Sequence, residues 1–167
     1  MQALVTTPGR EHSTRVEERP EPSGDGALVR VLEVGVCGTD REIDHGLFGD
    51  PPEEGRELVM GHEMLGVLAR DGGGFSKGDL VSATVRRSCH HCIACEEGSP
   101  DSCLTGDYRE RGITRLDGFA RELVVEHPDE GAFARRRRPF LDSCRVRLAG
   151  RRDERLHVRR RSAHRRP

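Results

Sequence analysis

The sequence has no tryptophan, one tyrosine and five phenylalanines, so aromatic residues make up only 4% of its 167 residues. A core without large rings must be built mainly from valine, leucine and alanine, although the length suffices for one ordinary domain. An apolar run of signal-peptide or membrane-span length is also missing. We therefore expect a cytoplasmic protein with no membrane partner. In that reducing compartment, clustered cysteines are more often metal ligands than disulfides.

Lysine is almost absent: the sequence contains only Lys77. Residues 1–130 contain 26 acidic and 14 basic residues, a net charge of −12, whereas residues 131–167 contain 3 acidic residues and 14 arginines, a net charge of +11. An acidic surface is typical of proteins that stay soluble in concentrated salt, where self-repulsion is screened. The composition of residues 1–130 therefore predicts a halophilic source.

Helix-length periodic patterns are missing from residues 1–130, which instead contain short apolar runs separated by glycine-rich turns. This organisation predicts a mainly β domain, a small barrel or a sandwich. One short helical turn is expected within "TDREIDHGLFGD" (39–50). The strands are expected at 2–7, 26–36, 80–85 and 118–126, and within a long apolar run at 57–69 that is broken by Gly61 and Gly66.

Residues 131–167 show no sustained strand or helix pattern, and we expect them to be a disordered tail. One interpretation is a basic arm for nucleic acid. Another is a shifted reading frame near codon 130, because GC-rich DNA read in an alternative frame yields arginine-rich peptide. Nucleic-acid arms usually mix lysine with arginine, so the exclusive use of arginine favours the shifted frame.

Four cysteines lie within "SCHHCIACEEGSPDSC" (88–103), at Cys89, Cys92, Cys95 and Cys103. Four thiolates suit a tetrahedral zinc ion and leave no open position for chemistry, so the pattern predicts a structural site that fastens one loop. Free thiols or a disulfide are the alternative. The interspersed His90 and His91 are expected to face solvent.

A fifth cysteine, Cys37, lies in "GVCGTD", and "GHE" follows 25 residues later with His62 and Glu63. These residues are weak signals alone, but with the four-cysteine loop they occur in the order found in zinc-dependent medium-chain alcohol dehydrogenases. Residues 1–130 resemble the N-terminal GroES-like β-barrel domain of that family. The segments "LVMGHEMLG", "TVRR" and "TGDYRERGI" are similar to its archaeal glucose dehydrogenase branch, which has halophilic members.

The resemblance implies roles for individual residues. Cys37 and His62 would bind a catalytic zinc, and Glu63 would ligate it directly or through water. Thr39 would hydrogen-bond the reacting hydroxyl and relay its proton, and Glu110 would bind sugar hydroxyls. The implied reaction is oxidation of a sugar, glucose at C1, with hydride transfer to NAD(P), NADP being slightly preferred.

The chain departs from the family after residue 130. No Gly-x-Gly-x-x-Gly turn is present, so we expect the Rossmann domain to be missing and the chain alone to be an inactive N-terminal fragment. Cys144 lies near the expected place of the remaining zinc ligand, but its surroundings match nothing in the family. The parent enzyme could be a homo-oligomer.

Two other readings compete with that of a dehydrogenase fragment. A zinc-stapled nucleic-acid-binding module would use the arginine tail, but the acidic body would repel phosphate. A domain that stores zinc is the third interpretation.

Overall fold

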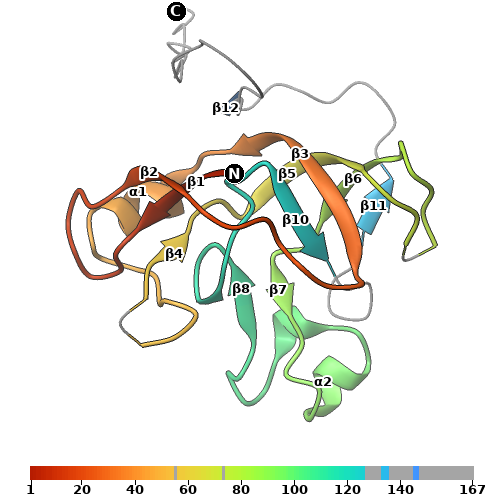
Figure 1. Cartoon of the computed structure of the whole chain (residues 1–167). Coiled ribbons are helices and arrows are strands. Elements are labelled where there is room, and N and C mark those ends of the chain that lie inside the picture. Colours follow the sequence, from red (N-terminus) through yellow and green to blue (C-terminus); the bar gives the residue numbers. More distant parts are fainter. Residues whose placement is uncertain (55, 73, 127–132, 136–144, 147–167) are drawn as a thin grey trace, which may run out of the picture.

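The computed structural model describes residues 1–54, 56–72, 74–126, 133–135 and 145–146, and the architecture is mainly β (Figure 1). The predicted fold class is confirmed. The strands of residues 1–126 are β1 (Gln2–Thr6), β2 (Arg15–Glu18), β3 (Ala27–Gly35), β4 (Leu58–Val59), β5 (Glu63–Leu68), β6 (Leu80–Ala83), β7 (Arg86–Arg87), β8 (Arg109–Arg111), β9 (Arg115–Leu116) and β10 (Leu123–Glu126). The helical elements are α1 (Gly38–Asp44), α2 (Ile93–Glu96) and the 3-10 turn η1 (Pro100–Ser102).

The largest sheet has the order β10-β3-β5-β6-β11, in which β11 is Phe133–Arg135, and β12 (Arg145–Val146) also pairs with β3. Strand β3 lies between β10 and β5 in this sheet. Its valines alternate with more exposed residues and point into the main core, as the partial alternation of 26–36 predicts. Among the described residues, Phe119 is the one aromatic ring fully buried in that core, and the partly buried Phe75 packs against it. The other buried members are smaller side chains: Ala27, Val29, Val31, Val34, Met64, Leu68, Val81, Ala120 and Val124. The lean core expected from the composition is therefore what the structure shows.

The apolar run at 57–69, which Gly61 and Gly66 interrupt in the sequence, is divided between two sheets. Strand β4 pairs with β1, whereas β5 pairs with β3 and β6. The chain changes sheet at Gly61, which has φ of +87°. A Cβ atom at this position would lie 2.8 Å from Val34 Cγ1 and 3.0 Å from the backbone nitrogen of Ala120, so a glycine is required. This break places His62 at the start of β5.

A small third sheet, β7-β8-β9, carries the cysteine loop and is joined to the main sheet by a buried ion network. Arg87 Nη2 donates to Glu126 Oε2 at 2.6 Å, and Arg111 Nη2 lies 2.7 Å from Glu126 Oε1. All three side chains are buried. Burial lowers the pKa of Arg111 to about 10, because desolvation disfavours its charge.

Two short strands lie beyond residue 130 and differ from the expectation of a tail without strands. Strand β11 (Phe133–Arg135) pairs with β6, and β12 (Arg145–Val146) pairs with β3 at Val34 and Gly35. Hydrogen bonding to exposed strand edges can override a sequence that has no strand pattern of its own. The rest of 131–167, including Cys144, lies outside the described residues, as does the expectation of disorder there.

Within the described part of the chain, no helix is both long and apolar enough to cross a membrane.

Candidate metal centres

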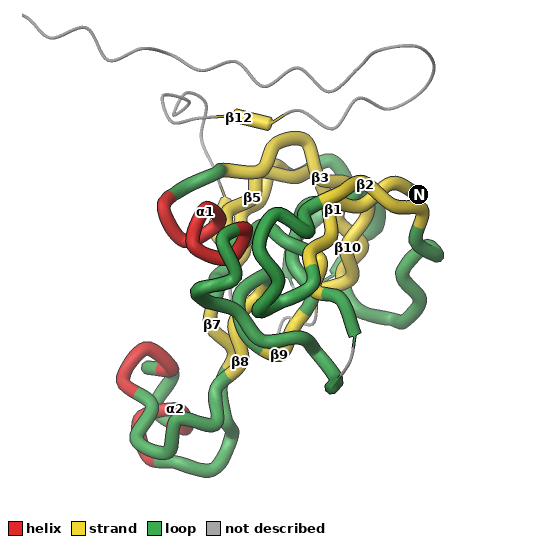
Figure 2. Tube along the Cα trace, turned by 90° about the vertical axis from the view of Figure 1, so that its left-hand side faces the viewer, coloured by secondary structure: helices red, strands yellow, loops and turns green. Residues whose placement is uncertain are grey.

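The four-cysteine loop forms a separate lobe between β7 and β8, and Figure 2 shows it projecting from the body around α2. Cys89 lies just after β7, Cys92 caps the N-terminus of α2, Cys95 lies within α2, and Cys103 follows η1. The two short helical turns thus present sulfurs from four points of the loop toward one centre.

The sulfur geometry of this lobe fits a tetrahedral zinc ion. The four Sγ atoms all lie within 4.8 Å of one another, and Cys92 and Cys103 Sγ are 3.9 Å apart. A disulfide needs about 2.05 Å. Four Zn–S bonds of about 2.3 Å place tetrahedral sulfurs about 3.8 Å apart. The separation therefore matches shared coordination.

Hydrogen bonds favour the thiolate form that a metal requires at two of the four cysteines, Cys103 and Cys89. Cys95 differs: a backbone hydrogen bond from Cys89 lowers its pKa, but burial and the neighbouring thiols outweigh it and raise the pKa to about 11. The Thr105 hydroxyl lies 3.4 Å from Cys103 Sγ and is the main reason why the pKa of Cys103 falls to about 6. The backbone N–H of His91 likewise lowers the pKa of Cys89. His90 and His91 are exposed, and the two ring nitrogens of His91 face the Cys89 carbonyl oxygen and Asp107.

A second group joins Cys37, Asp40 and His62, whose possible ligand atoms all lie within 4.8 Å of one another. Cys37 caps the N-terminus of α1, so β3 and α1 together fix its position. Cys37 Sγ lies 3.2 Å from His62 Nε2. Tetrahedral zinc would hold sulfur and nitrogen about 3.6 Å apart, so a small outward movement would admit the ion.

Asp40 connects the two candidate ligands, and the sequence analysis did not single it out. One carboxylate oxygen accepts the Cys37 backbone N–H at 2.9 Å, and the other lies 3.5 Å from His62 Nδ1. The Asp40 carboxylate beside the ring is the main reason why the pKa of His62 rises to about 9, although burial opposes it. At 3.5 Å the contact is too long to count as a hydrogen bond, and the buried Nδ1 atom has no other hydrogen-bond partner among the described residues. The signal for Asp40 was its place three residues after the cap, where a carboxylate accepts the cap N–H.

Glu63 and Thr39 lie beside this pair. Glu63 Oε1 is 3.9 Å from His62 Nε2, and its side chain is 52% exposed. Gly35, the strand partner of Glu63, leaves room for this carboxylate, because a Cβ atom there would collide with Glu63. Thr39 is half-buried in the first turn of α1. Both residues therefore adjoin the candidate ligands, although the group of three contains Asp40 and not Glu63.

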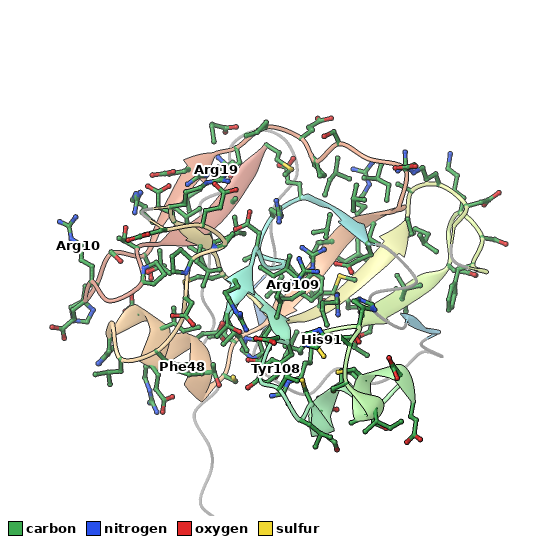
Figure 3. All side chains as sticks on the ribbon, turned by 90° about the horizontal axis from the view of Figure 1, so that it is seen from below. Arg10, Arg19, Phe48, His91, Tyr108 and Arg109 are labelled. Carbon is green, nitrogen blue, oxygen red and sulfur yellow. The ribbon has the colours of Figure 1, made fainter. Side chains whose placement is uncertain are left out.

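Glu110 lies on β8, and its carboxylate is already engaged. Its Oε1 accepts from Arg86 Nε at 3.0 Å and from Nη2 at 2.8 Å. The Arg86 guanidinium also lies 4.0 Å from the centroid of the Tyr108 ring. Figure 3 labels Tyr108 and His91, which belong to the segment between β7 and β8. A ligand at Glu110 would therefore meet an ion pair backed by an aromatic ring.

The chain belongs to the Alcohol dehydrogenase GroES-like domain family, whose match covers residues 23–134. This membership confirms the resemblance that the cysteine loop, "GVCGTD" and "GHE" indicated. Among curated relatives, glucose 1-dehydrogenase of Methanocella arvoryzae is 47% identical over 135 residues, which cover 77% of this chain and 38% of that relative. Glucose 1-dehydrogenase of Halobacterium salinarum is 40% identical over 132 residues, covering 77% of this chain and 37% of that relative.

Solved structures agree with this assignment. Haloferax mediterranei glucose dehydrogenase in complex with NADP, Zn and gluconolactone superimposes with a TM-score of 0.71 at 36% identity. The match covers 81% of this chain and 38% of that chain. This chain thus spans less than two fifths of the length of these relatives and corresponds to their N-terminal part.

Proposed function

We propose that this chain is the N-terminal part of an enzyme that oxidises glucose at C1. The hydride would be transferred to a nicotinamide cofactor, NADP by preference. The proximity of Cys37 Sγ and His62 Nε2 carries the proposal, because a thiolate and an imidazole at 3.2 Å form a partial zinc shell that leaves positions open for substrate. The names of the relatives supply the substrate class.

We further propose two zinc centres with different roles. Cys89, Cys92, Cys95 and Cys103 would hold a structural ion, since four thiolates close the shell. Cys37 and His62 would hold a catalytic ion. Glu63 would reach it directly or through water, and Asp40 would orient the His62 ring. The Lewis acidity of zinc bound there would lower the pKa of the C1 hydroxyl of the sugar.

Side chains of this chain would position the sugar and remove the proton of its C1 hydroxyl. The Thr39 hydroxyl would accept the C1 hydroxyl proton and pass it toward solvent while the C1–H bond breaks. A nicotinamide cofactor, when bound, would supply the acceptor for the hydride from C1, and the C1–O bond would become the lactone carbonyl. Glu110, held by Arg86, would accept hydrogen bonds from other sugar hydroxyls.

Cobalt substitution tests this proposal. Co²⁺ at both centres should give thiolate charge-transfer bands, and Cys37→Ser should remove only the catalytic contribution. Gluconolactone should perturb the d–d bands of the Cys37/His62 centre and leave the four-cysteine bands unchanged. Sorbitol, which has no ring C1, serves as the control ligand. Spectra that gluconolactone leaves unchanged, or that Cys37→Ser leaves unchanged, would contradict the proposed function.

A further inference from the structure

A third group of metal-ligating side chains lies away from both candidate zinc centres. His12, Asp44 and His45 have possible ligand atoms that all lie within 4.8 Å of one another. His12 belongs to the loop between β1 and β2, Asp44 is the last residue of α1, and His45 caps that helix. Figure 1 shows this loop beside α1, and Figure 3 labels Arg10 and Phe48 from the two segments on the same side of the molecule.

Backbone contacts hold the two segments together without any ion. The His12 N–H donates to the Asp44 carbonyl oxygen at 2.7 Å. His12 itself has φ of +52°, a left-handed conformation that few non-glycine residues adopt. The Ser13 hydroxyl lies within 3.1 Å of the Thr7 and Arg10 carbonyl oxygens. The loop is thus ordered before any ligand binds, which lowers the entropic cost of assembling the group.

The side-chain arrangement resembles a metal shell with its outer support. His12 Nδ1 faces Asp44 Oδ2 at 3.2 Å, and the centroids of the His12 and His45 rings are 5.1 Å apart at 75°. The other ring nitrogen of His12, Nε2, lies 3.3 Å from Glu11 Oε1. A carboxylate that accepts the second N–H of a ligating histidine fixes the tautomer needed for coordination.

Electrostatics at this position favour a cation. The Asp44 carboxylate lies at the C-terminal end of α1, where the aligned peptide dipoles of the helix place partial negative charge. Glu11 adds a second carboxylate within reach of the same imidazole. Two imidazoles and one carboxylate match the preferences of borderline transition metals such as Zn²⁺ and Co²⁺, rather than Ca²⁺ or Mg²⁺.

We propose that His12, Asp44 and His45 form a third site, which binds a divalent transition metal and fastens the β1–β2 loop to the end of α1. Glu11 acts as a positioning residue through His12. The remaining coordination positions would be filled by water, because these side chains supply three ligands and His12 and His45 are exposed.

Titration with Zn²⁺, followed by NMR of the histidine Cε1–H resonances, tests the site in protein whose cysteine centre is already loaded. The His12 and His45 resonances should shift together with one shared dissociation constant. Mg²⁺ in place of Zn²⁺ should leave them unchanged. His45→Gln should abolish the shift of His12, and Glu11→Gln should weaken binding about 10-fold.

Asp44→Asn should also weaken the Zn²⁺ affinity measured from the two histidine shifts by at least about 10-fold. Glu42→Gln changes an exposed carboxylate on the same helix and should not alter this affinity. Backbone spectra report whether each variant remains folded, and the His45→Gln result does not depend on the Asp44 variant. Independent shifts of the two histidines, or a His12 shift that persists in His45→Gln, would overturn the site. Neither outcome depends on whether Cys37 and His62 bind zinc, so the test of this site is independent of the proposed function.

Discussion

Single residues decide what the Cys37/His62 centre can hold. Cys37 and His62 are 25 positions apart in the sequence, and this spacing does not show whether they lie close together in space. They could therefore be proposed as a pair of ligands only from the family resemblance. The structure adds Asp40, which contacts the backbone of one candidate ligand and faces the ring of the other. Sequence reasoning passed over it because a carboxylate in the first turn of a helix is usually only a cap.

Asp40→Asn should weaken zinc or cobalt binding at Cys37 and His62 by about 10- to 100-fold. Asparagine can still accept the Cys37 N–H, so the helix cap should survive, but the uncharged amide no longer stabilises the donating tautomer of His62. Cobalt titration read at the catalytic d–d bands measures the effect, with Glu42→Gln as the control on the same helix. Equal affinity in the Asn variant and the parent would show that Asp40 is only a cap.

At the scale of elements, β1, β3, β4, β5, β6 and β10 lie within the strand regions that the sequence predicted, whereas β2, β8 and the assignment of strands to sheets could not be read from it. Residues 57–69 form an apolar run that Gly61 and Gly66 interrupt, but the sequence does not show that the chain changes sheet at the first of these glycines. The division depends on close backbone approach at Gly61, whose carbonyl oxygen accepts the Phe119 N–H at 2.8 Å. The two-residue strands β7 and β9 carry too few residues for any periodicity to show.

Gly61→Ala should lower the free energy of unfolding by about 2–4 kcal/mol, because a positive φ and a crowded Cβ position act together. Gly78→Ala is the matched control. Its φ is +93°, but no atom lies within 4 Å of the added Cβ, so it should cost only about 1 kcal/mol. Urea unfolding of both variants gives the comparison. Equal losses would mean that packing at Gly61 contributes nothing.

The link between the third sheet and the main sheet makes a separate prediction. Glu126→Gln leaves Arg87 and Arg111 buried without a countercharge and should lower the free energy of unfolding by about 3–5 kcal/mol. Glu17→Gln, at a half-exposed surface ion pair with Arg15 and Arg19, should change it by less than about 1 kcal/mol. Urea unfolding monitored by far-UV circular dichroism measures both. A loss at Glu126 no larger than that at Glu17 would contradict the role of the buried network.

At the scale of the whole molecule, charge composition is the feature that needed no structure. The acidic excess of residues 1–130 and the single lysine suggested concentrated salt, and relatives from Halobacterium salinarum and Haloferax mediterranei are among the matches. Most carboxylates of the described part are exposed or half-buried. Composition, however, could not indicate which carboxylates face a metal ligand.

Molar salt should therefore stabilise the protein. Repulsion among exposed carboxylates is screened strongly when the Debye length falls from about 10 Å at 0.1 M to about 3 Å at 1 M salt. The urea midpoint should rise between 0.1 M and 2 M KCl. General salting-out would also raise it, so the discriminating measurement is a variant in which exposed carboxylates become amides: Glu21→Gln, Asp25→Asn, Glu54→Gln and Glu97→Gln. Removing repulsion should raise the midpoint of this variant at low salt and leave it less dependent on KCl. If the urea midpoints of the parent and the variant rose in parallel with KCl, charge repulsion would contribute nothing to the stabilisation by salt. The stabilisation would then come from general salting-out.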